Sequence, residues 1–170
     1  MKTRKYVLMA LLSSMALGLY ALECVIPPLT FIPGAKLGLA NIITMVAIYI
    51  FGKKEAFLIL MMRIVIASML FGQVMSMLYS VAGGLFSFVA LCICLKFIER
   101  SSMWATGIIC AIFHNLGQIV VAVLVTQQLS IAYYFLFLVI ISMISGVFTG
   151  VCADYCITYA QKILKHQKGL

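Results

Sequence analysis

Seven polar side chains stand within otherwise apolar stretches, and their types suit the binding of anions and hydrogen-bonding ligands. They comprise two cations, a carboxylate, an imidazole and three amides: Lys36, Arg63, Glu23, His114, Asn41, Asn115 and Gln118. Inside a bilayer such side chains are costly unless they are paired or face a watery cavity. Each is therefore a candidate ligand-binding residue.

The order of these residues along the chain predicts that they meet in one layer. Counting helical rise from the expected membrane surfaces places them in the middle and outward-facing half of the protein. Glu23 falls at the outer end of a first helix, Lys36 and Asn41 at the outer start of a second, and Arg63 near the middle of a third. Two cations against one carboxylate favour an anionic or strongly hydrogen-bonding ligand.

The remaining three residues come from one expected helix. Gln118 is four residues from His114 and three from Asn115, so it can share a helix face with either. His114 and Asn115 point apart, and one of them can face elsewhere. A purely structural interpretation also stands: Glu23 would pair with Arg63 or Lys36, and the amides would join helices through hydrogen bonds.

The elements that position these residues follow from the composition. Of the 170 residues, 65% are hydrophobic and 9% are charged, and the mean hydropathy is +1.20. These values are typical of an integral membrane protein. Apolar runs between turn signals predict an all-α bundle of six transmembrane helices in a single domain, 1–170, with helices near 6–26, 37–51, 55–71, 75–96, 103–126 and 131–160. The first run is too long for a signal peptide and is expected to be retained.

The basic residues predict the orientation. Ten of the twelve Lys and Arg residues fall on one side of a six-helix arrangement, namely Lys2, Arg4, Lys5, Lys53, Lys54, Lys96, Arg100, Lys162, Lys165 and Lys168. Basic residues in short loops stay in the cytoplasm, so both termini are expected there, in a multi-pass protein of the cell membrane. The net charge of +8 then reflects topology and attraction to lipid head groups, and gives no support for nucleic-acid binding. Asp154 is expected at this end, satisfied by Lys96, Arg100 or water.

Two stripes of small residues favour close helix packing. One comprises Ala10, Ser14 and Gly18, and the other is centred on Ser142, Gly146 and Gly150. Internal packing is the expected use of the second, while the first is a candidate docking face for a membrane partner. Gly83 and Gly84 interrupt the expected fourth helix, but they have no counterpart in the other half of the chain, which disfavours a standalone secondary transporter. The six cysteines lie in apolar runs and are expected to serve packing, with no metal or cofactor.

Four segments carry a resemblance to a known family: "PGAKLGLANIITMVAIYIFGKKEAF", "RIVIASMLFG", "LYSVAGGLFSFVAL" and "GIICAIFHNLGQIVVA". They resemble the Gx transporter family, whose members are often labelled heptaprenyl diphosphate synthase component I. That family is similar to the substrate-binding S components of energy-coupling-factor transporters. The resemblance implies a ligand site under the first external loop, and a helix 1 stripe that contacts a transmembrane coupling subunit driven by ATPases.

The family label raises a second hypothesis, a subunit of a prenyl diphosphate synthase. Prenyl transfer needs clustered carboxylates that hold magnesium. The chain has four carboxylates, each isolated in sequence: Glu23, Glu55, Glu99 and Asp154. We therefore expect no catalytic subunit, and a noncatalytic membrane partner of such an enzyme remains the alternative to a transporter component.

Overall fold

The computed structural model describes residues 2–25, 38–71 and 74–166, and within these ranges the secondary structure is entirely helical. Six α-helices and two short 3₁₀ helices follow one another: α1 (Lys2–Val25), α2 (Asn41–Phe51), α3 (Lys53–Phe71), α4 (Val74–Phe97), η1 (Arg100–Ser102), α5 (Met103–Thr126), η2 (Leu129–Tyr133) and α6 (Tyr134–His166). The predicted all-α class and the six helices are confirmed.

The second helix starts later than predicted. Gly38 has a φ of +80°, a backbone conformation that a helix does not contain and that glycine adopts without strain. A turn follows, in which Asn41 N–H donates to Gly38 O at 2.9 Å, and α2 begins only at Asn41. The prediction of a helix from residue 37 was wrong for this reason, and Lys36 lies outside the described residues.

A second correction concerns α4. It runs without a break from Val74 to Phe97, so Gly83 and Gly84 do not interrupt it. Glycine lowers helix stability by roughly 1 kcal/mol relative to alanine but does not by itself end a helix. The two glycines serve close packing instead, because side-chain atoms of neighbouring helices lie within van der Waals reach of both.

Four helical segments of the described chain are long and apolar enough to cross a membrane: Thr3–Val25, Val74–Phe97, Arg100–Thr126 and Leu129–Ile163. The shorter α2 has 11 residues, a length of about 16 Å against a hydrocarbon core of about 30 Å. α3 has 19 residues but carries Lys53, Lys54, Glu55 and Arg63. These features describe a multi-pass membrane protein in which the short α2 is buried among other helices. α3 leaves one apolar face exposed, which includes Leu58, Val65 and Met69.

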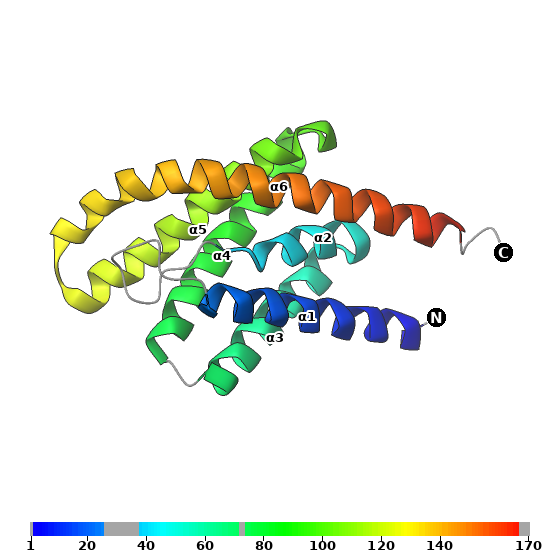
Figure 1. The fold of residues 1–170 in the computed structure, drawn as a ribbon, viewed down its shortest axis with the longest axis horizontal. Coiled ribbons are helices and arrows are strands. Elements are labelled where there is room, and N and C mark those ends of the chain that lie inside the picture. Colours follow the sequence, from blue (N-terminus) through cyan, green and yellow to red (C-terminus); the bar gives the residue numbers. More distant parts are fainter. Residues whose placement is uncertain (1, 26–37, 72–73, 167–170) are drawn as a thin grey trace.

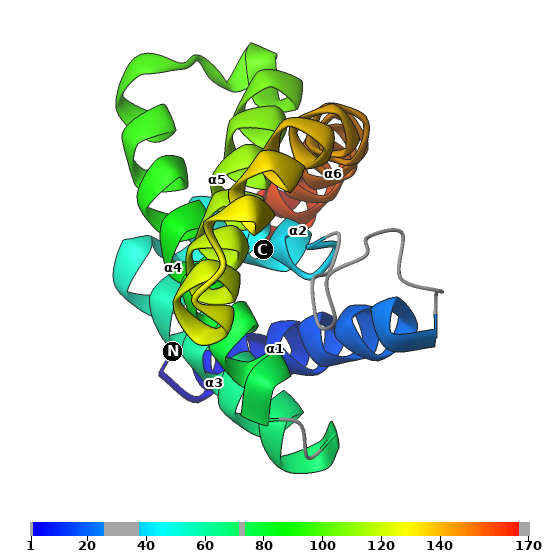
Figure 2. The ribbon, with the colours of Figure 1, turned by 90° about the vertical axis from the view of Figure 1, so that its left-hand side faces the viewer.

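The helices alternate in direction, so successive connections lie at opposite ends of the molecule (Figure 1). The start of α1, the α2–α3 junction, η1 and the end of α6 lie at one end, on the right of Figure 1. Both views place α2 between α1 and α6 (Figures 1 and 2). This central position explains why α2 buries eight consecutive residues, Asn41 to Ile48.

Glycines bring α5 and α6 into backbone contact. A Cβ on Gly146 would lie 2.4 Å from Ile108 Cα, and a Cβ on Gly107 would lie 2.1 Å from Gly146 O. Gly150 is equally close to the first turn of α5, where its Cβ would lie 2.4 Å from Met103 O. The small-residue stripe of α6 therefore serves internal packing, as predicted.

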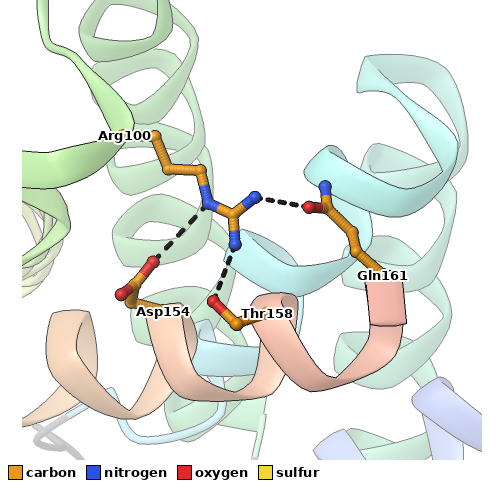
Figure 3. Close-up of polar contacts among 4 residues, drawn as sticks. All are labelled: Arg100, Asp154, Thr158 and Gln161. Atoms are coloured by element: carbon orange, nitrogen blue, oxygen red, sulfur yellow. Dashed lines mark hydrogen bonds and ion pairs between the residues drawn. The ribbon is translucent and has the colours of Figure 1, made fainter. Parts of the chain in front are cut away.

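Among the described residues, two ion pairs join helices near the end at which α1 starts and α6 ends. Lys5 of α1 pairs with Glu55 of α3. Arg100 of η1 reaches three residues of α6 (Figure 3): Nε lies 3.6 Å from Asp154 Oδ1, and the terminal nitrogens donate to Thr158 Oγ1 at 2.9 Å and to Gln161 Oε1. Of the partners predicted for Asp154, Arg100 is the one that forms an ion pair with it in the structure.

Candidate functional site

His114 forms the centre of a buried polar network. Its Nδ1 lies 3.1 Å from Asn41 Nδ2 at the start of α2, and its Nε2 lies 3.1 Å from Gln118 Nε2 one turn further along α5. The exposed fraction is 7% for Asn41, 4% for His114 and 1% for Gln118. The imidazole therefore joins two carboxamides from separate helices in a part of the protein that water does not reach.

Two glycines provide the space for this ring. A Cβ on Gly83 of α4 would lie 2.8 Å from His114 Cε1, and a Cβ on Gly38 would lie 3.3 Å from His114 Cδ2. Real side chains essentially never make contacts as short as the first. The ring is thus held between α4 and the turn before α2. Sequence reasoning missed both glycines as parts of the site, although the Gly83-Gly84 pair within an apolar run was a usable signal.

Arg63 of α3 is the most unusual charge in the described chain. Its exposed fraction is 4%, and its Nε has no hydrogen-bond partner among the described residues. The ion pairs that the described ranges contain, Lys5–Glu55 and Arg100–Asp154, do not involve it. Glu23, Tyr20 and His114 are close enough to interact electrostatically with the guanidinium. A buried cation without a contact partner is costly, so Arg63 needs an anion or water beside it.

Glu23 is engaged with the turn that leads into α2. Its Oε1 accepts hydrogen bonds from the backbone N–H groups of Gly38 and of Leu39, the latter at 3.0 Å. Hydrogen bonds to a carboxylate are about twice as strong as neutral ones. Glu23 therefore ties the end of α1 to the same turn whose glycine contacts His114.

Asn115 faces the other side of α5. Its Nδ2 donates to Ser142 Oγ of α6 at 2.7 Å, and Ser142 Oγ donates to Leu138 O at 2.7 Å. Both side chains are buried, and their hydrogen bonds strengthen the α5–α6 contact. His114 and Asn115 point apart as the helical spacing predicted, and a ligand-binding role for Asn115 stays a prediction.

The structure thus brings three of the seven candidates into direct contact, namely Asn41, His114 and Gln118. Arg63 and Glu23 lie near this network, whereas Asn115 turns away from it. An amide oxygen of the network, Gln118 Oε1, is buried without a hydrogen-bond partner among the described residues. No group of three or more His, Cys, Asp or Glu side chains able to hold a metal ion occurs in the part of the chain that the structure describes.

The candidate docking face on α1 is open. Ala10, Ser14 and Gly18 are all exposed, and a Cβ on Gly18 would meet no atom within 4 Å. Beside this stripe lies an apolar groove of about 770 Å³ between α1, α2 and α6, lined by residues that include Leu11, Met15, Val46, Ile50, Tyr159 and Ile163. The two small-residue stripes of this protein therefore differ, since α6 uses its stripe internally and α1 does not.

Comparison with known protein families gives one match, the family model for heptaprenyl diphosphate synthase component I, over residues 12–156. Curated proteins and solved structures give no significant match. The matched range includes the buried network, Arg63 and most of α1 to α6. A match over most of the chain, together with four apolar helices long enough to cross a bilayer, identifies this protein as a helical membrane protein that belongs to the heptaprenyl diphosphate synthase component I family.

Proposed function

We propose that this protein is the substrate-binding subunit of a small-molecule uptake transporter. The ligand site is formed around Arg63 by Asn41, His114 and Gln118, with Glu23 holding the adjoining turn. The proposal includes Lys36 and Asn115 as further ligand-binding residues. The resemblance of "PGAKLGLAN" and "HNLGQ" to the Gx transporter family and to S components supports this assignment.

The observation that carries the proposal is a buried guanidinium whose Nε has no hydrogen-bond partner among the described residues, beside a hydrogen-bonded polar network. Structural arginines in membrane proteins face a paired acid or backbone carbonyl groups. For Arg63 the nearby acid, Glu23, already accepts hydrogen bonds from two backbone N–H groups. A small anionic ligand would accept a hydrogen bond from this Nε and add to the negative charge that nearby Glu23 provides.

Native mass spectrometry of the detergent-purified protein tests this proposal. The wild-type protein should carry a bound small molecule, and Arg63→Gln should weaken its binding by roughly 10- to 100-fold, the effect of one charge-assisted hydrogen bond. Arg100→Gln is the matched control, because Arg100 bonds to α6 near the end of the bundle and its loss should leave the bound species in place. An equal amount of ligand in wild type and Arg63→Gln would refute the site.

The proposed partner is a transmembrane coupling subunit that works with ATPases and docks on Ala10, Ser14 and Gly18. Exposed small residues allow close backbone approach by a second helix, and the adjoining groove extends the apolar surface. Ser14→Leu should abolish co-purification with the coupling subunit while the monomer stays folded. Ala132→Leu, which enlarges an exposed small residue of η2, should retain it. An unchanged complex with Ser14→Leu would exclude this face.

The family match favours a second candidate function, a noncatalytic membrane subunit associated with a heptaprenyl diphosphate synthase. The two functions predict different partners. Affinity purification from native membranes should recover an ATPase module under the first proposal and a soluble prenyl synthase under the second. Recovery of the synthase alone would replace the transport proposal.

A further inference from the structure

The buried network restricts the chemistry of the ligand, and the reason is the proton count of the imidazole. Arg63 already places one cation in this region, so a second buried cation on His114 would be strongly unfavourable and the ring is neutral. A neutral imidazole has one N–H donor and one acceptor nitrogen. Both of its nitrogens lie 3.1 Å from a carboxamide, so one amide donates to the ring and the other accepts from it.

This requirement sets the two carboxamides in opposite senses. If Asn41 donates its N–H to Nδ1, then the Nε2–H group donates to the Gln118 oxygen and leaves the Gln118 NH₂ group for other partners. If Gln118 donates to Nε2, then the Nδ1–H group donates to the Asn41 oxygen and leaves the Gln118 oxygen for other partners. In either tautomer, one amide retains a C=O acceptor and the other retains N–H donors.

From this arrangement, which rests on the proposed function, we infer that the ligand carries both an anionic acceptor and a hydrogen-bond donor. The anionic group binds the Arg63 guanidinium, whose Nε is buried without a hydrogen-bond partner in the part of the chain that the structure describes, and a donor on the same molecule satisfies the remaining amide oxygen. A small carboxylic acid with an N–H or O–H group has this chemistry. An ion that offers acceptors only, such as sulfate, would leave a buried carbonyl oxygen without a partner, which is costly.

Two nearly isosteric acids test the inference: pyrrole-2-carboxylate, which adds an N–H donor to its carboxylate, and furan-2-carboxylate, which places an acceptor oxygen at that position. Binding of each to the full-length protein in detergent is measured by ligand-observed NMR and thermal shift. We expect pyrrole-2-carboxylate to bind roughly tenfold more tightly, the effect of leaving one buried oxygen unsatisfied. Sulfate, which has acceptors only, should bind no better than the furan acid.

Two variants separate the inference from the proposed function. Arg63→Gln should weaken both acids alike, because both use the carboxylate. Gln118→Met, which keeps the side-chain length, removes one of the two carboxamides. The Nδ1–H group can then donate to the Asn41 oxygen, no amide oxygen is left without a partner, and the preference should fall below roughly threefold. Melting temperatures of both variants verify that they are folded, and the comparison of the two acids on wild-type protein depends on neither variant.

The outcomes are distinct. Equal affinity for the two acids, with binding that still requires Arg63, would overturn the inference and leave the proposed site intact. Binding of neither acid at tens of millimolar, or binding that is insensitive to Arg63→Gln, would overturn the site together with the inference. A tenfold preference that disappears in Gln118→Met supports both.

Discussion

Replacing Gly83 with alanine should destabilise this protein, because the added methyl group would collide with the His114 ring. The new Cβ would lie 2.8 Å from Cε1 and 2.9 Å from Nδ1 of the imidazole. To escape, the ring must give up its contacts with Asn41 and Gln118, which contribute about 0.5 to 1.5 kcal/mol each. Displacing a packed side chain costs roughly 1 to 3 kcal/mol more, whereas the higher helix propensity of alanine returns about 0.5 to 1 kcal/mol. We expect a net loss of about 2 to 4 kcal/mol in the free energy of unfolding.

The neighbouring glycine provides the control. A Cβ on Gly84 would lie 3.2 Å from Leu60 Cδ1 and 3.3 Å from Ile64 Cδ1. These atoms are the flexible ends of aliphatic side chains and can yield by a few tenths of an ångström. Gly84→Ala should therefore change stability by no more than about 0.5 kcal/mol, since the small strain and the gain in helix propensity offset each other.

A double-mutant cycle isolates the clash. His114→Ala removes the ring, so adding Gly83→Ala in that background should cost nothing or stabilise by about 0.5 to 1 kcal/mol. Unfolding in mixed SDS and detergent micelles, followed by circular dichroism at the helical band, measures all four variants. The reasoning fails if Gly83→Ala is as stable as Gly84→Ala, or if its cost is the same with and without the imidazole.

Three further predictions concern topology and packing. In a cysteine-free background, Gln128→Cys should react with a membrane-impermeant thiol reagent added outside intact cells and Lys54→Cys should not; the reverse result would invert the orientation expected from the basic residues. Arg100→Lys should lower the unfolding free energy by about 0.5 to 1.5 kcal/mol, since one ammonium cannot reproduce three fixed contacts. Gly146→Ala should lower the free energy of unfolding by more than about 3 kcal/mol or prevent folding, because its methyl group would lie 2.4 Å from Ile108 Cα of α5. A variant with wild-type stability in the same detergent assay would contradict this packing.

The sequence predicted the helices well because their boundaries depend on local chemistry. Gly52, with a φ of +99°, separates α2 from α3 within the predicted gap between the helices near 37–51 and 55–71, and Gln127 ends α5 in the left-handed conformation. The start of α2 was missed because the apolar pattern of the sequence does not predict the positive φ angle of Gly38. That φ is stabilised by a distant residue, since Glu23 accepts the Gly38 N–H from the end of α1.

The site was predictable only in part, for the same reason. The i, i+4 spacing correctly places Gln118 beside His114, because both lie on one face of one helix. The Asn41 contact and the fit of the ring against Gly83 depend on how α2, α4 and α5 pack, and no local spacing contains that information. The stripes of α1 and α6 show the same limit. They look alike in sequence, but the α6 stripe packs against the α5 backbone from Met103 to Ile108, whereas the α1 stripe is exposed.

The contrast between the two faces of α5 is the strongest argument against a purely structural use of its polar residues. On one face, Asn115 donates to Ser142, whose hydroxyl donates to the backbone carbonyl of Leu138. Each donor in this chain of hydrogen bonds therefore has an acceptor within the protein. On the opposite face, an amide oxygen of Gln118 and the Nε of nearby Arg63 are left without partners among the described residues. Buried polar groups without partners are costly. Ser13 Oγ and Ser145 Oγ are also buried without partners among the described residues, but only Arg63 carries a charge and lies near several other polar side chains. This combination is why we propose that the Gln118 side of α5 binds a polar anion.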